Sequence, residues 1–284
     1  MDRIWTGILV LFLSLSPTAG AQTPDEQFQA ILKEFNTEGY ALRQATTDEE
    51  RNKIVVRVEK LTSRLMELAE KNRGEPIAMD ALVQVAVHEM WMENNTPHPG
   101  RGQDSPEIPA IKILLRDHAQ SDKAGEACRR LSYSFRKECE TFIRRVLEVN
   151  PHRTERGMAC LRLAQHLNNR VQKIDLLEEQ PEMAKRYDGL FGKEYVAGLR
   201  RRDRAKAIKE VESVFERAVR EYGDVQLTYG GLVGERAASE LYEIRSLAVG
   251  MPAQEIEGDD QEGIRFKLSD YRGKVVLLYF WSEY

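Results

Sequence analysis

Three cysteines, Cys128, Cys139 and Cys160, are the side chains of this 284-residue chain best suited to redox or metal chemistry. On one continuous helix the first two would be separated by about three turns, or ~16 Å of rise. A disulfide needs Cα atoms within roughly 7 Å, so that pair is excluded within a single helix. Either one could pair with Cys160 across a helix interface, which leaves one thiol free. The simpler interpretation is three buried structural thiols.

Metal ligation and histidine-assisted catalysis are not favoured by the sequence. Neither Cys128 and Cys139 nor Cys160 and His166 have the spacing of a zinc site. The 5 histidines lack a neighbour in the sequence that would make one of them the base of a catalytic nucleophile. We therefore expect no metal site, no cofactor and no catalytic residue within this chain.

Composition indicates a globular protein and excludes a dedicated nucleic-acid binder. Hydrophobic residues make up 42% of the chain and charged residues 31%, with a net charge of -4. A nucleic-acid binder would show a strong basic excess, so we expect no nucleic-acid partner. The densest basic run, Arg200 to Arg204, lies inside a helical pattern and is followed by Glu210, Glu212 and Glu216. A solvated helix face explains this run better than the alternative, a phosphate-binding patch.

The first 21 residues are typical of an export signal. Ile8 to Leu15 is apolar apart from Ser14, a Ser-Pro-Thr break follows, and Ala19-Gly20-Ala21 supplies small residues for a signal peptidase. The apolar stretch is shorter than the ~20 residues that span a bilayer. We expect cleavage after Ala21 and export, with the periplasm as the destination; the alternative is an uncleaved N-terminal membrane anchor.

Helical periodicity covers the chain from Asp25 to about Leu247. Residues Thr47 to Glu50 form a capping-box pattern, and Pro76 is placed as a first-turn proline. The loop predicted at 94–109 contains four prolines and two glycines. The pattern predicts these helices and apolar faces: one with the stripe Phe28, Ile31, Leu32 and Phe35; one with Ile54, Val58, Leu61, Leu65 and Leu68; then 77–92, 110–119, 122–149, 154–177, 193–222 and 235–247.

The predicted fold class is mainly α, followed by the β start of a second domain. Residues 126–167 resemble helix pairs of the tetratricopeptide type, with Pro151 at the turn between two helices. A helical-repeat domain and an irregular helical bundle both fit this pattern. In either case Met90, Trp91 and Met92 are expected in a core and not in a ligand site.

The sequence changes character at Gly250. Residues 255–257 and 264–268 alternate in polarity around a turn-rich segment, which predicts a β-hairpin, and Ser269 to Gly273 forms a turn. Val275 to Trp281 is continuously apolar, the pattern of a strand buried on both faces of a sheet. We therefore predict a helical domain at 22–248 and a second domain that starts at 249–284.

Residues 249–284 resemble the opening of a redoxin domain of the thioredoxin superfamily, in the branch of TlpA-like thiol-disulfide reductases and AhpC/TSA-type antioxidant proteins. The resemblance rests on Val249-Gly250, Pro252-Ala253, Gly263, Leu268 to Tyr271, Gly273 to Leu277 and Phe280-Trp281. It implies that Pro252, Tyr279, Trp281 and Tyr284 flank an active site. Gln254 replaces the second proline of the motif, and Tyr279 stands where many relatives have an Asp or Asn, which makes a proton relay at that position doubtful.

The resemblance places the nucleophilic cysteine of a Cys-x-x-Cys motif directly after Tyr284. The first hypothesis is therefore a cell-envelope thiol-disulfide oxidoreductase whose catalytic motif lies outside the given chain, either because the chain is a fragment or by natural truncation. Its partners would be protein thiols and disulfides, or an electron-donating thiol protein.

A peroxidase is less favoured than a reductase, because residues 280–284 lack the proline and threonine of a peroxidatic motif. The alternative hypothesis is a helical-repeat module that binds a peptide or protein and retains a redoxin remnant. Under both hypotheses the chain as given is predicted to be inactive.

Overall fold

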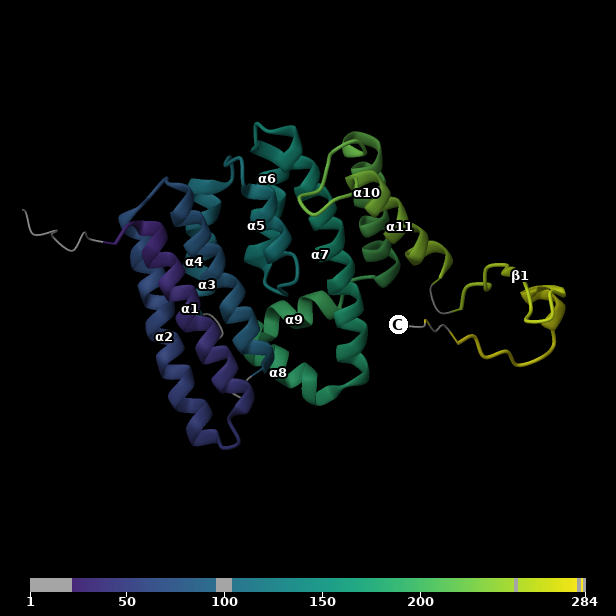
Figure 1. Ribbon diagram of the computed structural model, residues 1–284, viewed down its shortest axis with the longest axis horizontal. Helices are drawn as coiled ribbons and strands as arrows, with labels where there is room; N and C mark the ends of the chain where they lie inside the picture. Colours follow the sequence, from purple (N-terminus) through teal and green to yellow (C-terminus); the bar gives the residue numbers. More distant parts are fainter. Residues whose placement is uncertain (1–21, 96–103, 248–249, 280–281, 283–284) are drawn as a thin grey trace, which may run out of the picture. The chain divides into compact units, whose positions relative to one another are not determined.

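The structure is a computed structural model that describes residues 22–95, 104–247, 250–279 and 282 (Figure 1). The described residues are mainly α-helical and contain one two-stranded antiparallel sheet, which confirms the predicted mainly-α class. Backbone contacts divide the chain into two compact units, Met1–Ala81 and Leu82–Tyr284. The division near residue 248 that the sequence suggests stays a prediction, since residues 248–249 lie outside the described residues.

The first unit is built on an antiparallel pair, α1 (Pro24–Gln44) and α2 (Asp48–Lys71), which lie side by side in Figure 1. Both helices start at a capping box. The Thr23 and Thr47 hydroxyls accept the backbone N–H of the residue three positions later, and the glutamate carboxylate at that position accepts the backbone N–H of the threonine. The predicted apolar faces are confirmed, because every predicted position is buried except the half-buried Leu32.

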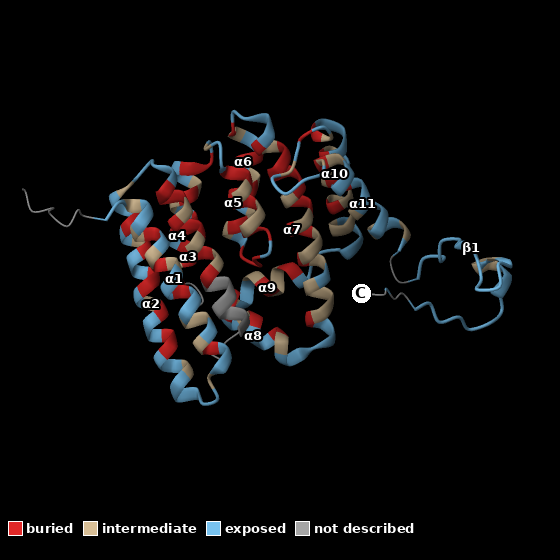
Figure 2. Ribbon diagram, viewed as in Figure 1, coloured by how far each residue is buried: buried red, intermediate tan, exposed pale blue. Residues whose placement is uncertain are grey.

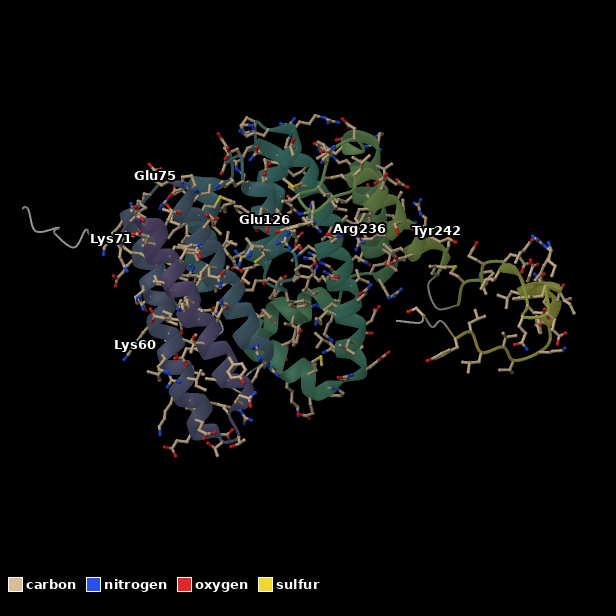
Figure 3. The ribbon with its side chains drawn as sticks, viewed as in Figure 1. Lys60, Lys71, Glu75, Glu126, Arg236 and Tyr242 are labelled. Atoms are coloured by element: carbon tan, nitrogen blue, oxygen red, sulfur yellow. The ribbon has the colours of Figure 1, made fainter. Side chains whose placement is uncertain are left out.

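Charged side chains cover the outside of this pair and join its two helices. Arg57 donates two hydrogen bonds to Glu38, at 2.7 and 2.8 Å. The exposed Lys60 and Lys71 of α2, labelled in Figure 3, lie away from the buried stripe. Such exposed charges contribute solubility more than stability.

In the second unit, α7 is the central helix, and α5, α6, α10 and α11 pack against it (Figure 1). Figure 2 shows the buried residues of α7 gathered between Glu155 and Arg170, with Leu177 buried near the end of the helix. The helices are α3 (Pro76–Asn95, which begins in the first unit), α4 (Glu107–Ile113), the π-helix η2 (Leu114–His118), α5 (Ala124–Leu131), α6 (Lys137–Val149), α7 (Arg153–Glu179), α8 (Pro181–Phe191), α9 (Lys193–Arg200), α10 (Arg204–Tyr222) and α11 (Val233–Ser246).

The predicted helix 122–149 is two helices, α5 and α6, separated at 132–136. Ser132 donates its hydroxyl to the carbonyl of Arg129, and the Ser134 hydroxyl accepts the N–H of Arg136. These local bonds offer the backbone an alternative to the helix. The break also turns Phe135 and Arg136 into the interior, where both are buried.

The predicted helix 193–222 is also two helices, because α9 ends at Arg200 and Asp203 starts α10 as its N-cap. Its carboxylate accepts the N–H of Lys206 and caps α10. The run Arg200 to Arg204 therefore lies at a helix junction, and the prediction that it sits within one helix is wrong. Three other predicted helices are confirmed with bounds close to the predicted ones: α3, which begins at Pro76, α7, which was predicted at 154–177, and α11, which was predicted at 235–247.

Helix α8 was not predicted, and an aromatic cluster explains it. Phe135 packs against Tyr187 and Phe191 with ring centroids 5.2 and 5.1 Å apart. The same buried cluster includes Leu177, Leu190, Val196 and Leu199, so α8 is fixed by contacts with residues distant in the sequence.

The predicted loop 94–109 is too long, because α4 starts at Glu107. Pro109 lies in the first turn of α4, where a proline costs no helix hydrogen bond.

The predicted hairpin is confirmed. Strands β1 (Glu257–Asp259) and β2 (Arg265–Lys267) pair antiparallel, with Gly258 opposite Phe266. The 3₁₀-helix η3 (Leu268–Tyr271) follows, where a turn was predicted. The strand predicted at Val275 to Trp281 is not formed over its described part, 275–279, because no neighbouring strand supplies hydrogen bonds there.

Candidate functional site

The structure describes two of the four residues that the redoxin resemblance places beside an active site. Pro252 is exposed, and Tyr279 is 80% exposed. Trp281 and Tyr284 lie outside the described residues. The active-site flank therefore stays a prediction.

The three thiols are buried and free, as the simpler interpretation predicted. Cys128 lies on α5, Cys139 on α6 and Cys160 on α7, and each is fully buried. Burial raises the pKa of all three thiols, in the case of Cys160 to about 12. Neighbouring carboxylates raise it further, Glu155 beside Cys128 and Glu107 beside Cys139. Because the thiolate is the reactive form, none of these cysteines is poised for thiol-disulfide exchange.

We expect the native protein to react with a thiol reagent such as dithionitrobenzoate about a hundredfold or more slowly than the urea-unfolded chain, since reaction requires opening of the helical core. The absorbance of the thionitrobenzoate that the reagent releases measures both reaction rates. One thiol that titrates rapidly in the native state would contradict this assignment of all three to the core.

A buried polar cluster surrounds Cys139. The Arg136 guanidinium donates to Glu107 at 2.5 Å, and both side chains are almost inaccessible to solvent. The Ser134 hydroxyl and the Cys139 thiol donate to the other carboxylate oxygen at 3.1 and 3.7 Å. The Arg136 guanidinium also lies over the Phe191 ring, 5.2 Å from its centroid. Both oxygens of the Glu107 carboxylate accept hydrogen bonds from these donors. The cluster therefore fixes the α5–α6 break and offers no open site.

A second charged network joins α6, α7 and α10. Glu140 accepts hydrogen bonds from Arg144 at 2.9 Å and from Arg170, and Arg144 reaches Glu210 at 2.6 Å. Burial opposes ionisation of Glu140, but the two guanidinium groups overcome it and hold its pKa below the usual range. Burial, with Arg170 nearby, lowers the pKa of His166 to about 4. His166 is therefore neutral at pH 7 and is a core residue.

An open pocket with a cavity volume of about 100 Å³ lies beside this network, between α7, the end of α9 and the start of α10. The apolar part of its wall comes from all three helices: Leu167, Val171, Ile174, Leu199 and Ala207.

The charged part of the pocket wall is rich in arginine. Arg204 is held by Asp175 through two hydrogen bonds of 2.9 and 2.8 Å, and Arg170 is held by Glu140. Arg200 and Arg202 are exposed and have no ion-pair partner among the residues that the structure describes. The pocket therefore combines an aliphatic wall with two unpaired cations.

The sequence interpretation missed this site because it continued one helix through 201–203. The cue was present: Asp203, three residues before Lys206 and at the start of an apolar-periodic segment, is an N-cap pattern. With the break in place, Arg200 and Arg202 remain exposed to solvent and also line the pocket.

No group of three or more potential metal-ligating side chains occurs in the described ranges, and no helix there is long and apolar enough to cross a bilayer. The predicted leader at 1–21 lies outside those ranges. Searches found no family model, no curated protein and no solved structure that matches this chain.

Proposed function

We propose that the protein serves thiol-disulfide exchange in the cell envelope, with residues 249–284 as the opening of a redoxin domain. The observation that carries this proposal is the apolar run Val275 to Tyr279, whose residues are between 42% and 103% exposed. It follows a formed hairpin and the turn of η3. The order hairpin, turn and apolar run is the order in the redoxin motif.

An apolar run of this kind is stable when a sheet covers it. Burying a Val or Leu side chain contributes about 1.5–3 kcal/mol, and an exposed apolar strand tends to aggregate. The remaining strands and helices of a redoxin domain would cover Val275 to Tyr279 and bury both faces. This requirement supports the proposed domain, together with the sequence resemblance.

The catalytic thiolate cannot come from Cys128, Cys139 or Cys160, which are buried and protonated. In the proposed enzyme it is the cysteine that the resemblance places directly after Tyr284. A thiolate there would be stabilised by the N-terminus of the helix that follows the strand in this fold. It would attack a disulfide of a substrate protein, form a mixed disulfide and release one substrate thiol, and the second cysteine of the motif would resolve that intermediate. An electron-donating thiol protein would then reduce the enzyme.

The test compares chain 1–284 with the product of the complete reading frame of its gene in an insulin disulfide reduction assay. We expect no reduction by the former and reduction by the latter, with loss of activity when the first cysteine after Tyr284 is replaced by serine. Cys160→Ser is the matched control and should leave the activity unchanged. A stop codon directly after codon 284, or insulin reduction by chain 1–284 itself, would end this proposal.

A second candidate function is ligand binding by the helical region, independent of any redox chemistry. The pocket between α7, α9 and α10 favours it, because two arginines without an ion-pair partner in the described residues lie beside an aliphatic wall. The chemistry of that pocket narrows the ligand to one class.

A further inference from the structure

We propose that the pocket between α7, α9 and α10 binds a carboxylate attached to an aliphatic group. A medium-chain fatty acid and the last residue of a peptide ending in leucine share this chemistry. The inference rests on the second candidate function, binding by the helical region. It does not depend on the thiol-disulfide proposal, whose assay reads a different part of the protein.

The aliphatic requirement comes from the pocket wall. Leu167, Val171 and Ile174 follow one another along one face of α7, at the i, i+4, i+7 spacing of a helix stripe. Leu199 faces them from the end of α9 and Ala207 from α10. These side chains carry no hydrogen-bonding groups, so this part of the pocket favours a saturated chain over a polar ligand.

The anionic requirement comes from the balance of charge at the pocket. The wall contains four arginines and three carboxylates, and most of them are already paired. Asp175 is bound by Arg204, and Glu210 is bound by Arg144 from outside the pocket. Glu178 lies close enough to Arg204 to raise the pKa of that guanidinium further, so its charge is partly offset.

The two remaining cations, Arg200 and Arg202, come from the last residue of α9 and from the junction that follows. Arginine binds carboxylates through two parallel hydrogen bonds, which makes it the side chain suited to this ligand group. Two arginines at one pocket that already has an aliphatic wall match a ligand with a carboxylate at one end and an alkyl group at the other. A neutral or cationic amphiphile would leave these charges unpaired.

The first experiment titrates octanoate into the full chain and follows binding by calorimetry, with octanol and octylamine as ligands that keep the alkyl group and change the head. We expect saturable binding of octanoate and binding at least about tenfold weaker for the other two, the effect of losing a charged hydrogen bond. An acetylated tripeptide ending in leucine, compared with its C-terminal amide, distinguishes a peptide source from a lipid source. Failure of both carboxylates to bind would overturn the proposal.

The second experiment locates the site. Arg202→Glu should weaken octanoate binding by about tenfold or more, since it replaces attraction by repulsion. Arg201→Glu is the matched control, because Arg201 belongs to the same basic run but does not line the pocket. It should change the affinity by no more than about threefold, as expected of a screened exposed charge.

A steric pair makes the same test without changing charge. Ala207→Phe fills the pocket from α10 and should abolish binding, whereas Ala205→Phe, on an exposed part of the same helix, should leave it intact. Circular dichroism of each variant shows whether the helices are preserved. Octanoate binding that survives Ala207→Phe in a folded protein, or that octanol equals, would show that this pocket is not a carboxylate site.

Discussion

Replacing Arg136 with methionine is expected to lower the free energy of unfolding by about 3–5 kcal/mol, the range for removing one partner of a buried ion pair. Arg136 and Glu107 are 2% and 0% exposed in their side chains and are joined at 2.5 Å. Methionine retains most of the volume of the arginine stem, so the main loss is electrostatic. The carboxylate of Glu107 then stays in the core beside the Ser134 hydroxyl and the Cys139 thiol but without its buried cation. Urea denaturation followed by circular dichroism measures the change.

The control is an exposed ion pair of the same residue types. Arg220 donates to Glu221 at 2.9 Å, but its side chain is 66% exposed. Arg220→Met should change the free energy of unfolding by no more than about 1 kcal/mol, because exposed pairs are solvated and screened. The difference between the stability losses of Arg136→Met and Arg220→Met is the effect of burying the ion pair, apart from the effect of losing an arginine.

A double variant tests whether the charge left behind causes the loss. Glu107→Leu combined with Arg136→Met removes both charges, and apolar replacements of buried ion pairs often restore stability. We expect the double variant to be more stable than Arg136→Met alone. The effects of Glu107→Leu and Arg136→Met on the free energy of unfolding could instead simply add, or Arg136→Met alone could cost less than about 1 kcal/mol. Either result would show that the cluster does not hold the α5–α6 break as an ion pair.

Local signals in the sequence predicted the helices well. The capping box at Thr47, the first-turn Pro76 and the stripe from Ile54 to Leu68 act through residues three or four apart, and the structure confirms each. The β-hairpin was predicted for the same reason, since alternation within two short segments determines which residues face each other.

The missed features depend on residues that are distant in the sequence. The break at 132–136 is stabilised by Glu107, which lies 29 residues before Arg136. Helix α8 is fixed by its contacts with Phe135. The run Val275 to Tyr279 has strand composition but depends on a neighbouring strand, and the described residues supply none. The pocket shares this origin, because its walls come from three helices and its two unpaired arginines lie at the junction before Asp203.

The packing of α5 on α7 depends on the absence of a side chain at Gly125. This glycine lies in the first turn of α5 and donates its N–H to the carboxylate of Glu155 at 2.6 Å. The carboxylate thereby satisfies one of the unpaired N–H groups at the helix N-terminus, where negative charge is stabilised. A Cβ at position 125 would lie 2.3 Å from the Met158 methyl carbon, 2.8 Å from its Cβ and 2.9 Å from Glu155 Oε2.

Gly125→Ala is therefore expected to lower the free energy of unfolding by about 1–3 kcal/mol, the usual cost of overpacking a core. The Met158 methyl can rotate away, but its Cβ is fixed to α7, so the two helices must separate or the Glu155 hydrogen bond must lengthen. Gly189→Ala is the matched control, because Gly189 is an exposed residue of α8 with nothing within 4 Å of the added carbon. There alanine should raise stability by about 0.5–1 kcal/mol through its greater helix propensity. The two substitutions thus have opposite signs in the same denaturation assay, and equal effects would show that α5 does not approach α7 closely enough to require glycine.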